Sequence, residues 1–190
     1  MNVMKAMKAP VSQNRVRLIS GQVLRAVVVV FFSLAAASLT AKAQTTLGGH
    51  IGCVLPLVTR SDGQTTTLSD NFSVGFPVGI TVKGTGKMAF DLEFVSSVQD
   101  SPRDVSLTVH PGLLYGVGHG FTIGGRAAFV VDSAEYGFTP LLNKGWPIKS
   151  KGSFFKAYFV EADLPVRFDR PVGGPNTNPV TFAMHFGLGF

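Results

Sequence analysis

Large apolar residues alternate with small or polar residues along most of the chain after residue 43. The clearest run, residues 180–190, closes the sequence and ends in a phenylalanine. Its large positions are Val180, Phe182, Met184, Phe186, Leu188 and Phe190, and between them stand Thr181, Ala183, His185, Gly187 and Gly189. Alternation with a period of two predicts a β-strand whose two faces meet different surroundings.

Six further runs of the same kind are separated by stretches rich in Gly, Pro, Asn and Asp. They cover residues 47–57, 72–82, 88–94, 105–115, 121–131 and 158–168. Residues 133–152 fit either a weak strand near 136–142 followed by a turn, or one long loop. The sequence therefore predicts seven strands and leaves an eighth open.

The two faces of these seven runs differ in composition. One face is rich in Phe and Val and carries no charge, whereas the other holds mainly Gly, Ala, Thr and Ser. A soluble β-sandwich covers its outward face with Lys, Glu, Thr and Ser. A charge-free apolar face is expected next to lipid, because an Arg or Lys near the middle of a bilayer costs about 2–4 kcal/mol. In lipid only a helix or a closed barrel pairs every backbone polar group.

These patterns predict an all-β fold, a closed antiparallel up-and-down transmembrane β-barrel of about eight strands. A barrel with both chain ends on one side needs an even number of strands, which favours a strand at residues 136–142. The more polar connections (59–70, 96–103, near 132–136, and 169–179) then fall at one end, and the tight turns (83–87 and 116–120) at the other. A soluble periplasmic β-protein is the alternative fold.

The first 43 residues have the features of a secretory signal peptide. Five basic residues precede the apolar stretch 26–39, and Ala41-Lys42-Ala43 forms a small-x-small cleavage site before Gln44. The apolar stretch is shorter than the roughly 20 residues of a spanning helix. We predict a signal peptide at 1–43, cleaved after Ala43, and a barrel at 44–190.

Cleavage at this site changes the charge of the protein. The whole chain has 17 Lys and Arg against 11 Asp and Glu, and six of the basic residues but none of the acidic ones precede Gln44. The remainder is balanced, so the basic pI gives no reason to expect a nucleic-acid partner. The single cysteine, Cys53, permits no internal disulfide.

A few charged residues fall on the small, inward face of the predicted strands. They are Asp91, Glu93, Arg126, Glu161, Asp163 and Arg167. Unpaired buried charge is costly, so these side chains are predicted to form a hydrogen-bonded ion network in the lumen. The interior of an eight-stranded barrel is just wide enough for side chains to fill.

Three of the four histidines, His50, His110 and His185, also fall on the inward face. They fit either a metal or proton site or ordinary polar filling, and filling is favoured because no Cys or carboxylate stands at ligand spacing from them. We therefore predict no metal and no cofactor. Acyl transfer needs a base within reach of a nucleophile, and no His-x-Ser motif occurs, so no enzyme is predicted. A membrane-embedded lipid-modifying enzyme is a minor alternative.

The signal, the rhythm of strands and turns, and the terminal strand together resemble the small outer-membrane β-barrel (porin-family) proteins of Gram-negative bacteria. Residues 161–166 (EADLPV) are similar to an E-x-P-hydrophobic strand of those proteins, with one residue inserted before Pro165. The resemblance implies a monomer in outer-membrane lipid. It also implies recognition of the C-terminal strand, through Phe182, Phe186 and Phe190, by the barrel-assembly machinery. The expected function is structural or a surface interaction, and the rival is a narrow channel or transporter for small or apolar solutes.

Overall fold

The computed structural model describes residues 45–150 and 152–190. The predicted signal peptide, residues 1–43, lies outside the described residues. The strands are β1 (Thr46–Ser61), β2 (Gln64–Thr67), β3 (Ser73–Lys83), β4 (Met88–Gln99), β5 (Asp104–Gly118), β6 (Phe121–Val130), β7 (Tyr136–Pro147), β8 (Ala157–Asp163), β9 (Val166–Phe168) and β10 (Val180–Gly189). In the described part of the chain, no helix has the length and apolar character needed to cross a membrane.

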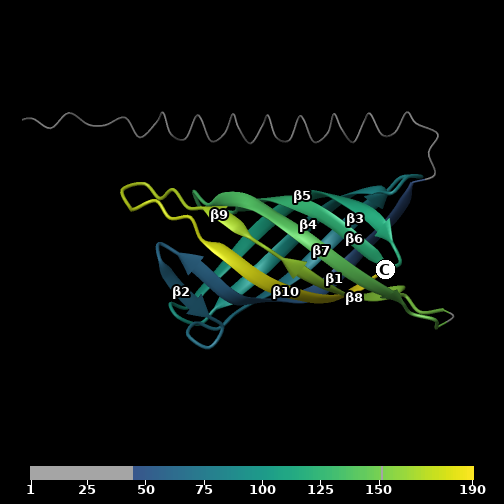
Figure 1. Ribbon diagram of the computed structural model, residues 1–190, viewed down its shortest axis with the longest axis horizontal. Helices are drawn as coiled ribbons and strands as arrows, with labels where there is room; N and C mark the ends of the chain where they lie inside the picture. Colours follow the sequence, from purple (N-terminus) through teal and green to yellow (C-terminus); the bar gives the residue numbers. More distant parts are fainter. Residues whose placement is uncertain (1–44, 151) are drawn as a thin grey trace, which may run out of the picture. The chain divides into compact units, whose positions relative to one another are not determined.

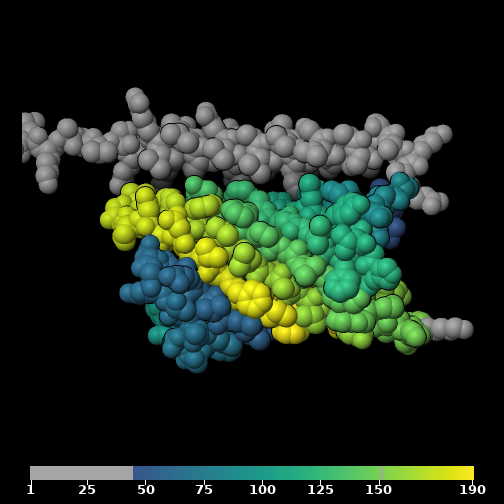
Figure 2. Space-filling model, in the orientation of Figure 1, coloured from purple at the N-terminus to yellow at the C-terminus, as the bar shows by residue number. Residues whose placement is uncertain are grey.

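The strands form a closed antiparallel barrel (Figure 1). Each long strand pairs with its neighbour in the chain, and β10 pairs with β1 from His50–Gly189 to Arg60–Val180, which closes the ring. In Figure 2 the blue residues of β1 and β2 lie directly against the yellow residues of β10. The short strands β8 and β9 both pair with β7, one after the other along its length, and together they act as one strand of the wall. The barrel therefore has eight strands around its circumference. The predicted all-β fold, a closed antiparallel up-and-down barrel of about eight strands, is confirmed.

The open question at residues 133–152 is resolved by β7. This strand pairs with β6 over nine residues, from Phe121–Lys144 to Phe129–Tyr136, and it extends five residues beyond the predicted end at 142. On its inward face lie Thr139, Leu141 and Asn143, and on its outward face Phe138 and Leu142 are exposed. The alternation was hard to see in the sequence because Pro, Gly and Lys interrupt it.

The barrel reverses the burial pattern of a soluble protein. The buried side chains are mostly polar or charged, and the exposed ones are large and apolar. On β3, for example, Phe76, Val78 and Ile80 are 50%, 53% and 49% exposed. The apolar face of the predicted strands therefore points outward along the whole wall, and the small face lines the interior.

Two of the predicted loops are partly strand. The stretch 96–103 was predicted as a loop, but β4 runs to Gln99, so the connection is only 100–103. The stretch 59–70 was also predicted as a loop, but β1 runs to Ser61 and turns back into β2. Asp62 and Gly63 both have positive φ, at 50° and 81°, which is the backbone of a two-residue hairpin turn. Of the polar residues in these two stretches, Thr59, Ser97 and Gln99 are on strands and line the interior.

The connections define two ends of the barrel. The loop end carries residues 62–72 with β2, and 100–103, 131–135 and 169–179. The turn end carries 84–87, 119–120 and 148–156, together with Thr46 and Phe190. The predicted contrast in length holds for the first two turns. It fails for 148–156, which is longer than two connections at the loop end.

Candidate functional site

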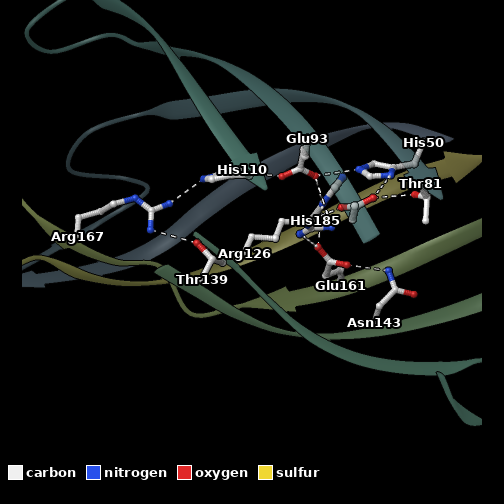
Figure 3. A network of polar contacts seen from close by, with 11 residues as sticks. His50, Thr81, Glu93, His110, Arg126, Thr139, Asn143, Glu161, Arg167 and His185 are labelled. Carbon is white, nitrogen blue, oxygen red and sulfur yellow. Dashed lines mark hydrogen bonds and ion pairs between the residues drawn. The ribbon is translucent and has the colours of Figure 1, made fainter. Parts of the chain in front are cut away.

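Arg126, on β6, lies at the centre of a polar layer that crosses the barrel interior (Figure 3). Its Nε donates to Asp91 Oδ2 at 2.9 Å, and its Nη1 donates to Glu161 Oε1 at 2.6 Å. Its Nη2 lies 3.7 Å from Glu93 Oε2. All four side chains are at most 4% exposed, so one guanidinium is shared by three buried carboxylates from β4 and β8. Charge-assisted contacts of this kind are the stronger class of hydrogen bond.

Glycines on neighbouring strands make room for this layer. Gly112 is the register partner of Arg126, and a Cβ on Gly112 would lie 2.5 Å from Arg126 Cγ. Gly79 is likewise the partner of His50, and its Cβ would lie 2.1 Å from the imidazole Cε1. Real Cβ atoms do not approach so closely. The small residues of the inward face therefore place the large polar side chains across the barrel.

The three inward histidines all contact carboxylates. His50 Nε2 lies 2.9 Å from Glu93 Oε2, and His110 Nδ1 lies 3.0 Å from Glu93 Oε1. His185 Nδ1 lies 3.4 Å from Glu161 Oε1. Spacing along the sequence did not reveal these contacts, because the carboxylates come from other strands.

Two further polar side chains complete the layer, and sequence reasoning missed both. Thr81 Oγ1 donates to Asp91 Oδ1 at 2.7 Å, and Asn143 Nδ2 donates to Glu161 Oε2 at 2.9 Å. Both stand on inward positions of their strands. The only signal in the sequence was this shared face, which many Thr and Ser residues also occupy.

Arg167 does not contact the acidic cluster, which consists of Asp91, Glu93 and Glu161, and it lies nearer the loop end. It donates to Thr139 Oγ1 at 3.1 Å and to His110 Nε2 at 3.2 Å. Because His110 then accepts at Nε2 and donates through Nδ1, its ring is neutral. At the rim, Glu135 Oε1 lies 3.9 Å from Arg167 Nε. Burial raises the pKa of the Glu135 carboxyl, and the Arg167 charge opposes that rise.

Asp163 is buried in the interior, but its Oδ1 has no hydrogen-bond partner. The six predicted residues therefore differ in their roles. Asp91, Glu93 and Glu161 gather on Arg126, whereas Arg167 reaches them only through His110. All six side chains do lie in the interior.

The polar layer lies between two cavities. A vestibule of about 880 Å³ opens toward the loop end, with Asn71, Ser133 and Glu135 among its outer lining residues. A smaller pocket of about 150 Å³ lies toward the turn end. Arg126 lines both cavities.

Of the predicted assembly residues, Phe182 and Phe186 lie on the outward face of β10, and Phe190 directly follows this strand. Phe182, Phe186 and Phe190 are 41%, 44% and 37% exposed. Phe190 exchanges backbone hydrogen bonds with Gly49, at 2.9 and 3.1 Å, and its ring stacks on Phe154 at 5.0 Å between centroids. The last residue is therefore part of the barrel seam.

At the loop end, Asp70 forms hydrogen bonds with Thr67 outside the barrel wall. Asp70 Oδ2 accepts from the Thr67 hydroxyl at 2.7 Å and from the Thr67 amide at 2.8 Å. These hydrogen bonds lower the pKa of the Asp70 carboxyl. The carboxylate thereby orders the chain between β2 and β3.

Comparisons with known proteins found similarity to solved structures only. No family model matches the chain, and no curated protein matches it. The outer membrane protein OprG from Pseudomonas aeruginosa is 12% identical over 78% of this chain and 97% of its own, with a TM-score of 0.35. Ail, the attachment invasion locus protein of Yersinia pestis, solved with the heparin analogue sucrose octasulfate, is 10% identical over 79% of this chain and 100% of its own, with a TM-score of 0.38. At these values the fold assignment depends on this chain's own strand pairing.

Proposed function

We propose that this protein is an outer-membrane β-barrel whose lumen is closed by the Arg126 layer and whose role is structural or a surface interaction. The main support for this proposal is the reversed burial pattern of the barrel. Large apolar side chains cover the outside of the wall and charged side chains fill the inside. Exposed apolar surface on this scale has a favourable environment only next to lipid or another apolar surface.

The ends of the wall carry the residues expected at the two membrane surfaces. At the turn end, Trp146 stacks on Tyr158 at 5.3 Å, and Lys144 Nζ lies 4.2 Å from the Phe121 ring centroid. At the loop end, the Tyr136 ring lies 5.6 Å from that of a neighbouring phenylalanine. Amphipathic aromatic rings and lysines favour the boundary between hydrocarbon and water.

The spacing of these aromatic residues fits a membrane. Tyr136 and Trp146 lie at opposite ends of β7, ten residue steps apart. At ~3.4 Å per residue and a tilt of ~40°, those steps span ~25 Å across the membrane, which is the height of the apolar band in such barrels. Lys144 is an outward charge that the seven predicted runs did not contain, and it stands at the edge of this band.

The closed layer favours a role at the surface over transport. A ligand entering the vestibule from the loop end meets Arg126 and its carboxylates before it can pass. The loops and the vestibule are then the parts that contact molecules outside the cell.

A narrow channel for small or apolar solutes is the second candidate. It is favoured by the two cavities, since the Arg126 side chain lines both of them. In this alternative the layer is a gate and not a plug.

Single-channel conductance in planar bilayers tests the two candidates. If the layer is a plug, the unmodified barrel is silent and Arg126→Ala opens discrete steps. Arg167→Ala is the matched control, because it removes an inward arginine that does not touch the acidic cluster. Steps in the unmodified barrel would favour the channel, and silence in Arg126→Ala would refute the plug.

The location and the assembly partner are tested together. We expect the exported protein to resist extraction by alkaline carbonate from the outer-membrane fraction, and recovery in the soluble fraction would support the soluble alternative. Deletion of Phe190 is expected to lower the amount of folded barrel in the membrane, if the assembly machinery recognises the C-terminal strand. Phe154→Ala removes the ring that stacks on Phe190 and leaves the terminus intact, so it should not reduce assembly to the same degree.

A further inference from the structure

Two buried side-chain atoms in the described part of the barrel have no hydrogen-bond partner, Asp163 Oδ1 and His185 Nε2. The two residues are only 5% and 2% exposed. A buried polar atom without a partner is costly, and a bound ion or an ordered water is one reason that a native protein keeps one.

Both residues belong to one cluster of possible metal ligands. Glu161, Asp163 and His185 each offer one ligand atom, and these atoms all lie within 4.8 Å of one another. The strands fix this arrangement, because His185 on β10 is the register partner of Glu161 on β8. Asp163 follows two residues later on the same inward face.

The charge of the interior favours a cation. Four carboxylates, on Asp91, Glu93, Glu161 and Asp163, face two guanidinium groups, on Arg126 and Arg167. The inward carboxylates therefore outnumber the inward guanidinium groups by two, which favours a bound cation. Uncompensated charge in a buried site is costly.

The surroundings hold the ligands in the way that metal sites require. Arg126 and Asn143 donate to the two oxygens of Glu161, at 2.6 and 2.9 Å, and orient that carboxylate. Hydrogen bonds from outer residues to ligating carboxylates are a regular part of metal sites. His185 Nδ1 lies 3.4 Å from Glu161 Oε1 and 3.9 Å from Glu93 Oε2, and its ring packs edge-on against Phe159, so the imidazole is held beside the carboxylates.

We propose that Glu161, Asp163 and His185 bind one divalent transition-metal ion of the zinc class. One imidazole and two carboxylates form a donor set that suits such ions, and three protein ligands leave a position open for water. Asp163 and His185 line the vestibule, so the ion and its water are reached from the loop end. Bonds of ~2.0–2.2 Å require the ligand atoms to move closer by about 1 Å, which side-chain rotation provides. The site does not depend on whether the barrel conducts.

Zinc content and cobalt absorption test the proposal on protein expressed as the full chain and purified in detergent. After incubation with Zn²⁺ and removal of the free metal, we expect one zinc per chain. Co²⁺ in the same site should show the intense visible bands of a four-coordinate complex. Asp163→Asn and His185→Gln are each expected to weaken zinc binding at least tenfold. Two variants are used so that a folding defect in one does not decide the result.

Glu135→Gln is the matched control, because it removes an acid that lines the same vestibule outside the cluster. It should retain one zinc per chain. No zinc in the unmodified barrel would overturn the proposal, and so would equal zinc in all variants, which would place the metal elsewhere. In the absence of zinc, Asp163→Asn should fold at least as well as the unmodified chain, because the Asp163 Oδ1 atom has no partner to lose.

Discussion

Replacement of Arg126 by methionine tests how the interior is stabilised. Arg126 is 4% exposed, and its guanidinium contacts three carboxylates that are themselves almost fully buried. Methionine fills a similar space with a flexible apolar side chain, so the cost of a cavity stays small. The main effect is that Asp91, Glu93 and Glu161 lose their shared positive partner.

The expected loss of stability is about 3–5 kcal/mol, the range found when one partner of a buried ion pair is removed. Summing three separate pairs would overestimate it, because the three contacts share a single cation and are not additive. A reversible urea titration in detergent measures the effect. Trp146, the one tryptophan in the sequence, stacks on Tyr158 in the wall and reports unfolding by its fluorescence.

Restoring the charge balance is the decisive control. The variant that combines Arg126→Met with Asp91→Asn and Glu161→Gln removes two of the three unpaired charges and keeps polar groups in their place. We expect it to recover more than half of the lost stability. A single-variant loss below about 1 kcal/mol would refute the idea that Arg126 organises the interior. Failure of the combined variant to recover would show that packing, and not charge, caused the loss.

Three other predictions concern packing, lipid contact and a loop. Gly79→Ala should destabilise the barrel by about 1–3 kcal/mol, because its Cβ would overlap a histidine ring, whereas Gly84→Ala, with open space around it, should change the unfolding free energy by less than about 0.5 kcal/mol. Leu142→Arg, near the middle of the outward face, should cost about 2–4 kcal/mol for folding into lipid vesicles and Val105→Arg at the loop end about 0–1 kcal/mol; equal costs would contradict the proposed membrane position. Because hydrogen bonds lower the pKa of the Asp70 carboxyl, its contribution to loop order is fully present above the ordinary pKa of 3.8 and is lost as the pH falls through the lower pKa of the folded state. The NMR chemical shift of the Thr67 amide, which donates to Asp70, should follow this change, and Asp70→Asn should abolish the acid-dependent step.

The pattern of alternation predicted most of the wall, and its errors have one cause. A polar residue can mark a loop in water or an inward position in a barrel, and local sequence does not distinguish the two. Ser97 and Gln99 were therefore assigned to a loop although they line the vestibule. The turn at Asp62-Gly63 carried a usable signal, since this dipeptide favours a hairpin.

The candidate site was predicted in its composition and not in its connections. The alternation of side chains along each strand was enough to place Glu93, Arg126 and His185 on the inward face. Which of them touch depends on the register between strands that are far apart in the sequence, such as the pairing of His185 with Glu161. A shift of one residue in that register would turn every side chain of a strand to the other face.

The sequence by itself determined that the chain forms strands with one apolar and one small or polar face, because side chains alternate along any strand. It also determined which charges share the inward face. Only the tertiary structure decided that Arg126 holds three carboxylates, that Arg167 stands apart, and that Asp163 Oδ1 has no partner. Those facts depend on strand register and on the space left by glycines on neighbouring strands, and both arise only when the barrel closes.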